Sequence, residues 1–301
     1  MSSHNHSHAP EGTPEGFHHE AVFYAGLDDF LTFAEPFLRD AVELHHPTLV
    51  AVSERKGAEL RRALGDHDDG VMIVDMVDIG ANPGRIIPAW KEFLAGHGGP
   101  GQTLRGIGEP IWADRTPAQL AEAEHMEHLL NLAFEDAESF WIACPYDTDT
   151  LSSTVIDNAR RTHPVLSHAG VTTVSDAYVD PEVAGVPFVG ELERAPTTAV
   201  EAHFSSVSDL AALRGLTRRV AADSGLSASR ASDLSVAVNE LATNSLLHAS
   251  GRGVLRAWSD TANVYCEISD AGLIEDRLIG RIPPSPGQVS GYGVWLVNQL
   301  C

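Results

Sequence analysis

The sequence has few cysteines, no long apolar run and a shortage of basic residues. Only Cys144, Cys266 and Cys301 occur among its 301 residues, far apart and without a CxxC pair, which excludes a disulfide framework and a zinc ribbon. No run approaches the ~20 apolar residues that a membrane span needs, and the N-terminus lacks the apolar core of a secretory signal. We therefore expect a cytoplasmic protein that does not contact a membrane.

The shortage of basic residues also bears on possible partners. Twenty Lys and Arg residues stand against 42 Asp and Glu, which gives a net charge of −22 and argues against direct binding of nucleic acid. The acids are concentrated in one part, with 30 acids and 11 bases in residues 1–190 against 12 and 9 in residues 191–301. Together with the chain length, this asymmetry predicts two domains, the first strongly acidic.

The first part of the chain alternates short apolar runs with longer helical patterns. Residues 1–17, which include His4, His6 and His8, offer no apolar period and are interpreted as a disordered tail. Five β-then-α units after it predict an α/β domain with a mostly parallel sheet. No GxxxxGK[ST] or GxGxxG motif follows any of its strands. The helices are expected at 28–44, 54–64, 84–95, 117–138 and 149–162.

The second part begins after a stretch rich in Ala, Pro, Val and acids, residues 168–197, which we interpret as a linker. A strand near 198–204 and helices at 206–223 and 227–249 should follow, the second helix capped by Ser227. Two further apolar runs, GVLRAWS and NVYCEIS, are separated by a short turn around Asp260 and predict a β-hairpin.

Polar side chains recur at four-residue spacing on the predicted helix 227–249. Glu240, Asn244 and His248 should form one ridge along the helix. Beside it runs a more apolar stripe of Leu234, Val238, Leu241 and Ser245. The helix alone does not decide between a solvent-facing ridge and a functional one.

The order of motifs after this helix favours a functional ridge. Asp270 follows Asn244 by 26 residues, at the end of a β-run and just before Gly272. Gly291 comes 21 residues later, and Gly293 opens an apolar helix. A lone GxG carries little information, whereas the ordered set N-E-x-x-x-N, D-x-G and G-x-G-x-x-L-V is specific.

With these motifs, residues 198–301 resemble the GHKL (Bergerat-fold) ATPase domain, an α+β sandwich. The ending GYGVWLVNQLC is especially similar to actinobacterial anti-sigma factors with serine-kinase activity. The resemblance implies that Asn244 coordinates Mg²⁺, that Glu240 is the catalytic base and that Asp270 receives the adenine amino group of ATP. It also implies that Gly272, Gly291 and Gly293 let the backbone approach the nucleotide.

The sequence departs from the family pattern in three places. Ile274 stands where the family often has a second glycine, and Tyr292 stands where a basic residue is common. Family domains usually continue into at least one more strand, so the resemblance implies a C-terminally truncated copy that leaves a sheet edge uncovered.

The first domain, residues 18–167, resembles the MEDS sensory domain of methanogen and methylotroph regulators. The similarity lies in the segments HHEAVFY, LRGIGEPIW, ACPYD and THP. Together the two domains resemble the RsbA-type anti-sigma regulatory proteins. Because crevices form at the carboxyl ends of parallel strands, a sensory pocket is expected near Arg105, Glu109, Cys144 and Tyr146.

Several histidines remain to be assigned. His19, Cys144 and His163 are suitable ligands for zinc or iron, but their spacing does not distinguish ligation from structural roles. A group of four others is predicted to lie on helix surfaces: His45, His46, His125 and His128.

The resemblances predict a cytoplasmic switch that binds Mg-ATP. Its partners would be an alternative sigma factor, which it sequesters, and a STAS-type anti-anti-sigma protein, which it phosphorylates on Ser or Thr. A homodimer is left open. Two alternatives stay open as well: a catalytically silent ATP-binding adaptor, favoured by Ile274 and Tyr292, and a sensor histidine kinase, for which residues 164–205 offer no dimerising helical hairpin.

Overall fold

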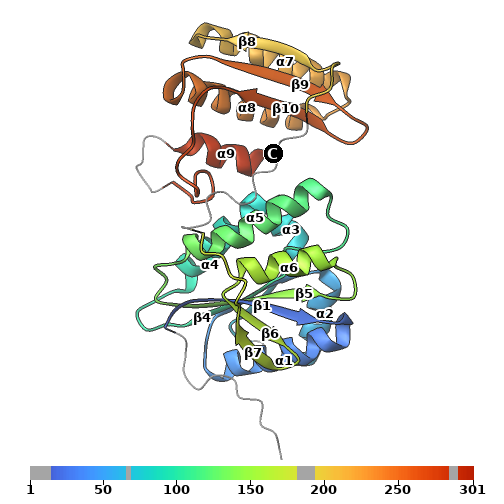
Figure 1. Ribbon diagram of the computed structural model, residues 1–301, viewed down its shortest axis with the longest axis vertical. Helices are drawn as coiled ribbons and strands as arrows, with labels where there is room; N and C mark the ends of the chain where they lie inside the picture. The colour runs from blue at the N-terminus through green and yellow to red at the C-terminus, as the bar shows by residue number, and fades with distance from the viewer. Residues whose placement is uncertain (1–14, 66–68, 182–193, 285–290) are drawn as a thin grey trace, which may run out of the picture. The chain divides into compact units, whose positions relative to one another are not determined.

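The computed structural model describes residues 15–65, 69–181, 194–284 and 291–301. The chain divides into two compact units, residues 1–189 and 190–301, and each is described by itself (Figure 1). No helix within the described ranges is long and apolar enough to cross a membrane.

A seven-stranded sheet forms the centre of the first unit, in the order β3-β2-β4-β5-β1-β6-β7. All neighbouring strands are parallel except β6 and β7, which form an antiparallel hairpin. Strands β2 and β4 are buried at every position, as expected for parallel strands covered on both faces. The strands are β1 Gly16–Tyr24, β2 Thr48–Val52, β3 Val71–Asp75, β4 Leu104–Gly108, β5 Ser139–Asp147, β6 Val165–His168 and β7 Val171–Val174.

Helices cover both faces of this sheet (Figure 1). α1 and α2 lie on one face, where their apolar residues join Val22, Tyr24 and Ile107 in one core cluster. α4, α5 and α6 lie on the other face. α5 begins with a capping box between Thr116 and Gln119, followed by Pro117 at its first position. The helices are α1 Gly26–Glu43, α2 Glu54–Leu64, α3 Met76–Gly80, α4 Ile86–His97, α5 Pro117–Ala133 and α6 Ser153–Thr162, with a 3₁₀ turn at Pro83–Arg85.

The α4 side of the sheet contains a close contact that only glycine permits. A Cβ atom on Gly106 would lie 2.6 Å from Cζ3 of Trp90, and one on Gly108 would lie 3.0 Å from its Cζ2. Trp90 is 3% exposed and also contacts Phe140 at a ring-centroid distance of 5.9 Å. The two glycines of β4 therefore provide the surface on which the indole of α4 packs.

The second unit consists of a three-stranded antiparallel sheet, in the order β10-β9-β8, and the helices α7, α8 and α9. α7 and α8 pack against the sheet, with Phe204, Leu213, Val238 and Leu255 in the shared core. Ser227 caps α8 by accepting a hydrogen bond from the Arg230 backbone N–H at 3.3 Å. The elements are β8 Val200–Phe204, a 3₁₀ turn Val207–Asp209, α7 Leu210–Asp223, α8 Ala228–His248, β9 Gly253–Ser259, β10 Val264–Ser269 and α9 Tyr292–Leu300.

These elements confirm the predicted order of an α/β unit followed by a second unit of helices on an antiparallel sheet, and three boundaries are corrected. The predicted tail, 1–17, overlaps β1, which begins at Gly16, while residues 1–14 lie outside the described residues. The helix predicted at 117–138 ends at Ala133, because Phe134 turns into the core and is 1% exposed. The predicted linker, 168–197, contains β7, which pairs with β6 and completes the first sheet, and residues 182–193 are not described.

Candidate functional site

α8 carries the two polar residues on which the second unit's site is built. Glu240 and Asn244 lie one helical turn apart and are both partly buried. His248, the third member of the predicted ridge, lies in the last turn of α8 and is exposed. The four-residue spacing thus brings Glu240 and Asn244 together and leaves His248 outside the site.

The first turn of α9 packs directly on these two side chains. A Cβ atom on Gly293 would lie 3.1 Å from Asn244 Nδ2 and 3.4 Å from both Asn244 Oδ1 and Glu240 Oε2. Gly291 is the N-cap of α9 with φ = 97°, a left-handed conformation that favours glycine, and it provides no side-chain cap. Among the described residues, no side chain accepts a hydrogen bond from the amide groups of this helix start, which lies beside Asn244.

The far end of α9 is fixed by polar contacts. Asn298 donates from Nδ2 to the Gly280 carbonyl oxygen at 2.9 Å, and Arg230 of α8 donates from Nη1 to the Leu300 carbonyl oxygen at 2.6 Å. A Cβ atom on Gly280, whose φ is +72°, would lie 2.6 Å from Val294 Cγ1. These contacts hold α9 against α8 in the position where Gly293 meets Asn244.

Asp270 follows β10 and is linked to α8 through its carboxylate. Its Oδ1 accepts from the Gly272 backbone N–H at 2.7 Å, and its Oδ2 accepts from Ser245 Oγ at 2.5 Å. A Cβ atom on Gly272 would lie 2.6 Å from Ala249 Cβ, so a larger residue would separate this loop from the end of α8. Since Ser245 is adjacent to Asn244 in the chain, Asp270 is placed beside the same part of the helix.

Asp270 also borders a cavity of about 550 Å³ at the edge of the sheet where β8 and β10 end and β9 begins. Its other lining residues come from the end of β8, the loop after α8 and the end of β10, and include His203, Phe204, Arg252 and Ser269. Glu240 and Asn244 do not line it. This cavity therefore adjoins the α8–α9 site without being part of it.

The four residues expected to line a sensory pocket in the first unit do not come together. The register pairs Arg105 with Trp141, whereas Cys144 pairs with Ala21, so the alternation of side chains places Arg105 and Cys144 on opposite faces of the sheet. Tyr146 lies on the same face as Cys144, with its ring 5.5 Å from that of His163. Glu109 faces the α1 and α2 side, so the sheet separates the predicted pocket into two places.

On the α1 and α2 side, Glu109 belongs to a buried polar group at the carboxyl end of the sheet. It accepts a hydrogen bond from Tyr24 Oη at 2.5 Å and forms an ion pair with Lys56, which also contacts Tyr24. Burial is the main cause that raises the pKa of Tyr24, and the Glu109 carboxylate adds to it. Arg105 is engaged elsewhere, in an ion pair with Asp40 at 2.5 Å.

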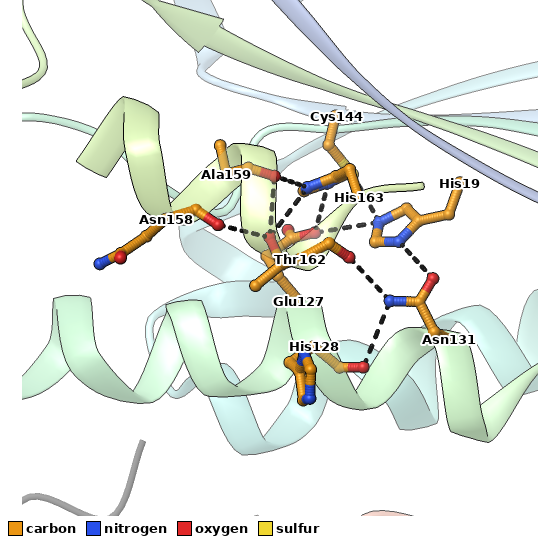
Figure 2. Close-up of polar contacts among 9 residues, drawn as sticks. All are labelled: His19, Glu127, His128, Asn131, Cys144, Asn158, Ala159, Thr162 and His163. Atoms are coloured by element: carbon orange, nitrogen blue, oxygen red, sulfur yellow. Dashed lines mark hydrogen bonds and ion pairs between the residues drawn. The ribbon is translucent and has the colours of Figure 1, made fainter. Parts of the chain in front are cut away.

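On the opposite face, four titratable side chains meet between the sheet and the helices α5 and α6 (Figure 2). They are His19 of β1, Cys144 of β5, Glu127 of α5 and His163, which directly follows α6. One ligand atom from each lies within 4.8 Å of all the others, and all four residues are buried. We call this group the HECH cluster.

The pKa values of three side chains in the HECH cluster are shifted from their ordinary values. Burial, with help from His163, lowers the pKa of His19 to about 4. Burial opposes ionisation of Glu127, but the close contacts of its carboxylate with the imidazoles of His163 and His19 outweigh it and lower the pKa of that carboxyl to about 2. Burial is also the main cause that raises the pKa of the Cys144 thiol.

The sequence analysis named three members of this cluster and missed Glu127. The missing signal was on α5, where Glu127 and Asn131 lie four residues apart and both contact His19. His128, predicted to lie on a helix surface, is 2% exposed. Five consecutive residues of α5, from Met126 to Leu130, are buried, so neighbouring residues cover this part of the helix on every side. This enclosure accounts for the burial of both Glu127 and His128.

The comparisons with known proteins find one family match within each of the two units. Residues 18–164 match the family model of the MEDS domain, the methanogen/methylotroph, DcmR sensory domain. Residues 205–301 match the model of the histidine kinase-like ATPase domain. A segment similar to a sensory domain thus precedes a segment similar to an ATPase domain. We refer to the two units below as the MEDS-like unit and the ATPase-like unit.

The remaining comparisons add little. No curated protein matches the chain. A solved ATPase domain is similar at 9% sequence identity with a TM-score of 0.33, over 51% of this chain and 69% of that one. A likeness at that level supports no argument.

Proposed function

We propose that the protein is a signalling regulator whose ATPase-like unit binds Mg-ATP and controls an alternative sigma factor, under the influence of a signal received by the MEDS-like unit. The observation that carries nucleotide binding is the contact of Gly293 with Glu240 and Asn244. The matches to a sensory family and to an ATPase family support a regulatory, kinase-like role.

The residues at the start of α9 fit a nucleotide phosphate. Magnesium prefers oxygen ligands and shares itself between one or two protein groups and the phosphates, so the Asn244 amide oxygen is a suitable ligand. The N–H groups at Gly291 and beyond, which no described side chain caps, favour an anion together with the positive end of the helix dipole. Bound Mg²⁺ would neutralise charge on the phosphates.

Glu240 and Asp270 fit the two ends of the same ligand. Glu240 lies one turn from Asn244, where its carboxylate can orient and deprotonate an attacking hydroxyl. Asp270 is exposed and ionisable, and each of its oxygens retains acceptor capacity beyond its bonds to Gly272 and Ser245. It can therefore accept a hydrogen bond from the 6-amino group of adenine, where guanine has a carbonyl oxygen instead.

The partners follow from the resemblance of the C-terminal segment GYGVWLVNQLC to anti-sigma factors with serine-kinase activity. We infer that the ATPase-like unit sequesters a sigma factor and phosphorylates a Ser or Thr of a STAS-type anti-anti-sigma protein. Phosphorylation would release that partner. The signal to the MEDS-like unit would change the balance between the state that sequesters the sigma factor and the state that is bound to the anti-anti-sigma protein.

A second candidate is an ATP-binding adaptor without phosphotransfer. Two features favour it: Ile274 and Tyr292, the departures from the family pattern, are 66% and 42% exposed next to the site. Ile274 stiffens the loop after Asp270 relative to glycine. Tyr292 provides no positive charge for a phosphate.

Label transfer from ATP decides between these functions. Full-length protein is incubated with Mg²⁺, γ-labelled ATP and a panel of purified anti-anti-sigma proteins. We expect acid-stable label on Ser or Thr of one partner. Glu240→Gln should reduce transfer by roughly 10² to 10⁴ with little loss of ATP affinity, because it removes the base and keeps the shape of the side chain.

Asn244→Ala should abolish Mg-dependent ATP binding, and with it the label transfer. Asn239→Ala is its matched control. Asn239 lies on the same helix, but its Oδ1 accepts a hydrogen bond from Arg214 Nη1 of α7 at 2.7 Å. ATP binding without transfer to any partner would establish the adaptor. Acid-labile label on the protein itself would indicate a histidine kinase, and absence of ATP binding in the folded protein would refute the proposal.

A further inference from the structure

The HECH cluster lies in the interior of the MEDS-like unit, apart from the proposed ATP site. His19 and His163 are 0% exposed, and Glu127 and Cys144 are 1% exposed. Figure 2 shows the four side chains converging from β1, β5, α5 and the end of α6. Because these four polar groups are buried away from water, their hydrogen-bonding atoms must be satisfied by shared protons or by a bound ion.

The hydrogen bonds around His19 fix which of its nitrogens carries a proton. Asn131 donates from Nδ2 to the carbonyl oxygens of Thr162 at 2.8 Å and His128 at 3.3 Å, which orients its Oδ1 toward His19. That oxygen lies 3.0 Å from His19 Nδ1, which must donate to it. In the neutral ring, the lone pair of Nε2 therefore faces Glu127 and Cys144.

His163 is oriented in the same way. Its Nδ1 lies 2.9 Å from the Ala159 carbonyl oxygen, which can only accept, so Nδ1 carries the proton. The neighbouring Thr162 hydroxyl has carbonyl acceptors of its own, at Asn158 and Ala159. The lone pair of His163 Nε2 therefore also faces the cluster. An outer hydrogen bond that fixes the imidazole and leaves Nε2 bare is the usual support of a metal-binding histidine.

No arrangement of protons on neutral groups satisfies all the inner contacts. Both bare Nε2 atoms lie 3.1 Å from the same oxygen, Glu127 Oε2, and the Cys144 Sγ lies 3.4 Å from His19 Nε2. A proton on Oε2 can serve only one of the two histidines. If it serves His163 and the Cys144 thiol donates to His19, then His19 Nε2 and Glu127 Oε2 still face each other at 3.1 Å with no proton between them. Protonating both rings would bury a net positive charge. The second carboxylate oxygen, Oε1, is buried and has no hydrogen-bond partner among the described residues.

We propose that His19, Glu127, Cys144 and His163 bind a divalent transition-metal ion, for which zinc is the best fit. Metal bonds of about 2.0–2.3 Å in a tetrahedron separate neighbouring ligand atoms by about 3.3–3.6 Å. Three of the separations are close to those edges: Glu127 Oε2 lies 3.1 Å from Nε2 of both His19 and His163, and Cys144 Sγ lies 3.4 Å from His19 Nε2. The other pairs of ligand atoms lie within 4.8 Å and would draw together around the ion. Binding converts the Cys144 thiol to a thiolate with release of its proton, after which thiolate and carboxylate balance the charge of the ion.

The ligand set also indicates what the ion does. All four positions come from protein side chains in a buried place, which is typical of a structural site and leaves no position for a reacting water. The ion would join two central strands, β1 and β5, to α5 and to the end of α6. Occupancy of the site would then set the stability of this whole side of the MEDS-like unit.

The test uses full-length protein in which His4, His6 and His8 are replaced by alanine, so that the N-terminal histidines cannot contribute. Metal is removed by chelation under reducing conditions, and cobalt(II) or zinc is added back without nucleotide. We expect one equivalent per chain and, with cobalt, a thiolate-to-metal charge-transfer band. Zinc should also raise the midpoint of thermal unfolding.

Three variants locate the site. Cys144→Ser should remove the charge-transfer band, whereas Cys266→Ser, which changes the partly buried cysteine of the other unit, should keep it. Asn131→Ala should keep the band and weaken affinity about 10- to 100-fold, because it removes only the outer support of His19.

The spectrum of the protein with an intact HECH cluster decides the question even if a variant does not fold. A folded protein that shows no charge-transfer band and no gain in thermal stability at saturating metal would overturn the proposal. The cluster would then be a hydrogen-bonded core network. Because no nucleotide is present, neither outcome depends on the proposed ATP site.

Discussion

Gly293→Ala tests whether the contact between α8 and α9 forms the nucleotide site. The added methyl group would lie 3.1 Å from Asn244 Nδ2, closer than ordinary contacts, which begin at 3.4 Å. The Asn244 amide must then move by a few tenths of an ångström or rotate away from its present direction. Loss of a hydrogen bond or ligand contact to a charged group costs about 1.5–3 kcal/mol, so Mg-ATP affinity should fall roughly 10- to 150-fold.

The same change should not destabilise the fold. Alanine is favoured over glycine within helices by up to about 1 kcal/mol, and the methyl group meets only the polar ends of two side chains that can shift. Gly215→Ala in α7 is the matched control, because its Cβ would make one ordinary contact, at 3.6 Å from Arg219 Nη1. Calorimetry and thermal unfolding measure affinity and stability on both variants. Wild-type Mg-ATP affinity in Gly293→Ala would show that α9 does not bound the ligand site.

Two further substitutions test other parts of the structure. Asp270→Asn should weaken ATP binding roughly tenfold and leave GTP binding unchanged, because only one of the two terminal atoms of an amide can accept a hydrogen bond from adenine, whereas both carboxylate oxygens can. The Ser245 hydroxyl can accept from the new amide instead of donating, which preserves the loop. Competition between ATP and GTP measures the preference, and an unchanged preference for ATP would show that Asp270 does not recognise adenine. Gly106→Ala should cost about 1–3 kcal/mol in urea unfolding, because its Cβ would lie 2.6 Å from Trp90, whereas Gly96→Ala in α4, with no atom within 4 Å, should not; equal stability of the two variants would contradict the close packing of Trp90.

The proximity of Glu240 and Asn244 on α8 could be predicted because it is local, while their proposed roles stay a prediction. A spacing of four residues places Glu240 and Asn244 on one ridge of any α-helix, and Ser227 marks where that helix begins. The order of motifs then anticipated that Asp270 and Gly293 lie nearby. What sequence could not provide is the reason for glycine at 293, which depends on the distance between two helices separated by a long connection.

The MEDS-like unit was predicted less well because its contacts depend on strand register. Whether Arg105 and Cys144 share a face is decided by the pairing of β4 with β5, and a shift of one residue would reverse the answer. Glu127 was missed for a related reason. It is separated from His19 by 108 positions in the chain, and its four-residue spacing from Asn131 does not by itself show that this side of α5 faces the sheet.

The β6–β7 hairpin has a practical consequence for anyone who isolates the first unit. The segment after it is tied to the end of α6, since Ser175 Oγ donates to the Arg160 carbonyl oxygen at 2.6 Å and the Val179 N–H donates to that of Arg161 at 3.0 Å. A fragment that stops at residue 167 would lose this strap beside His163 and expose the edge of β6 to pairing between molecules. A fragment that extends to residue 181 keeps both the paired edge of β6 and the contacts with the end of α6. An expressed or proteolytic fragment of the first unit should therefore not end before residue 181.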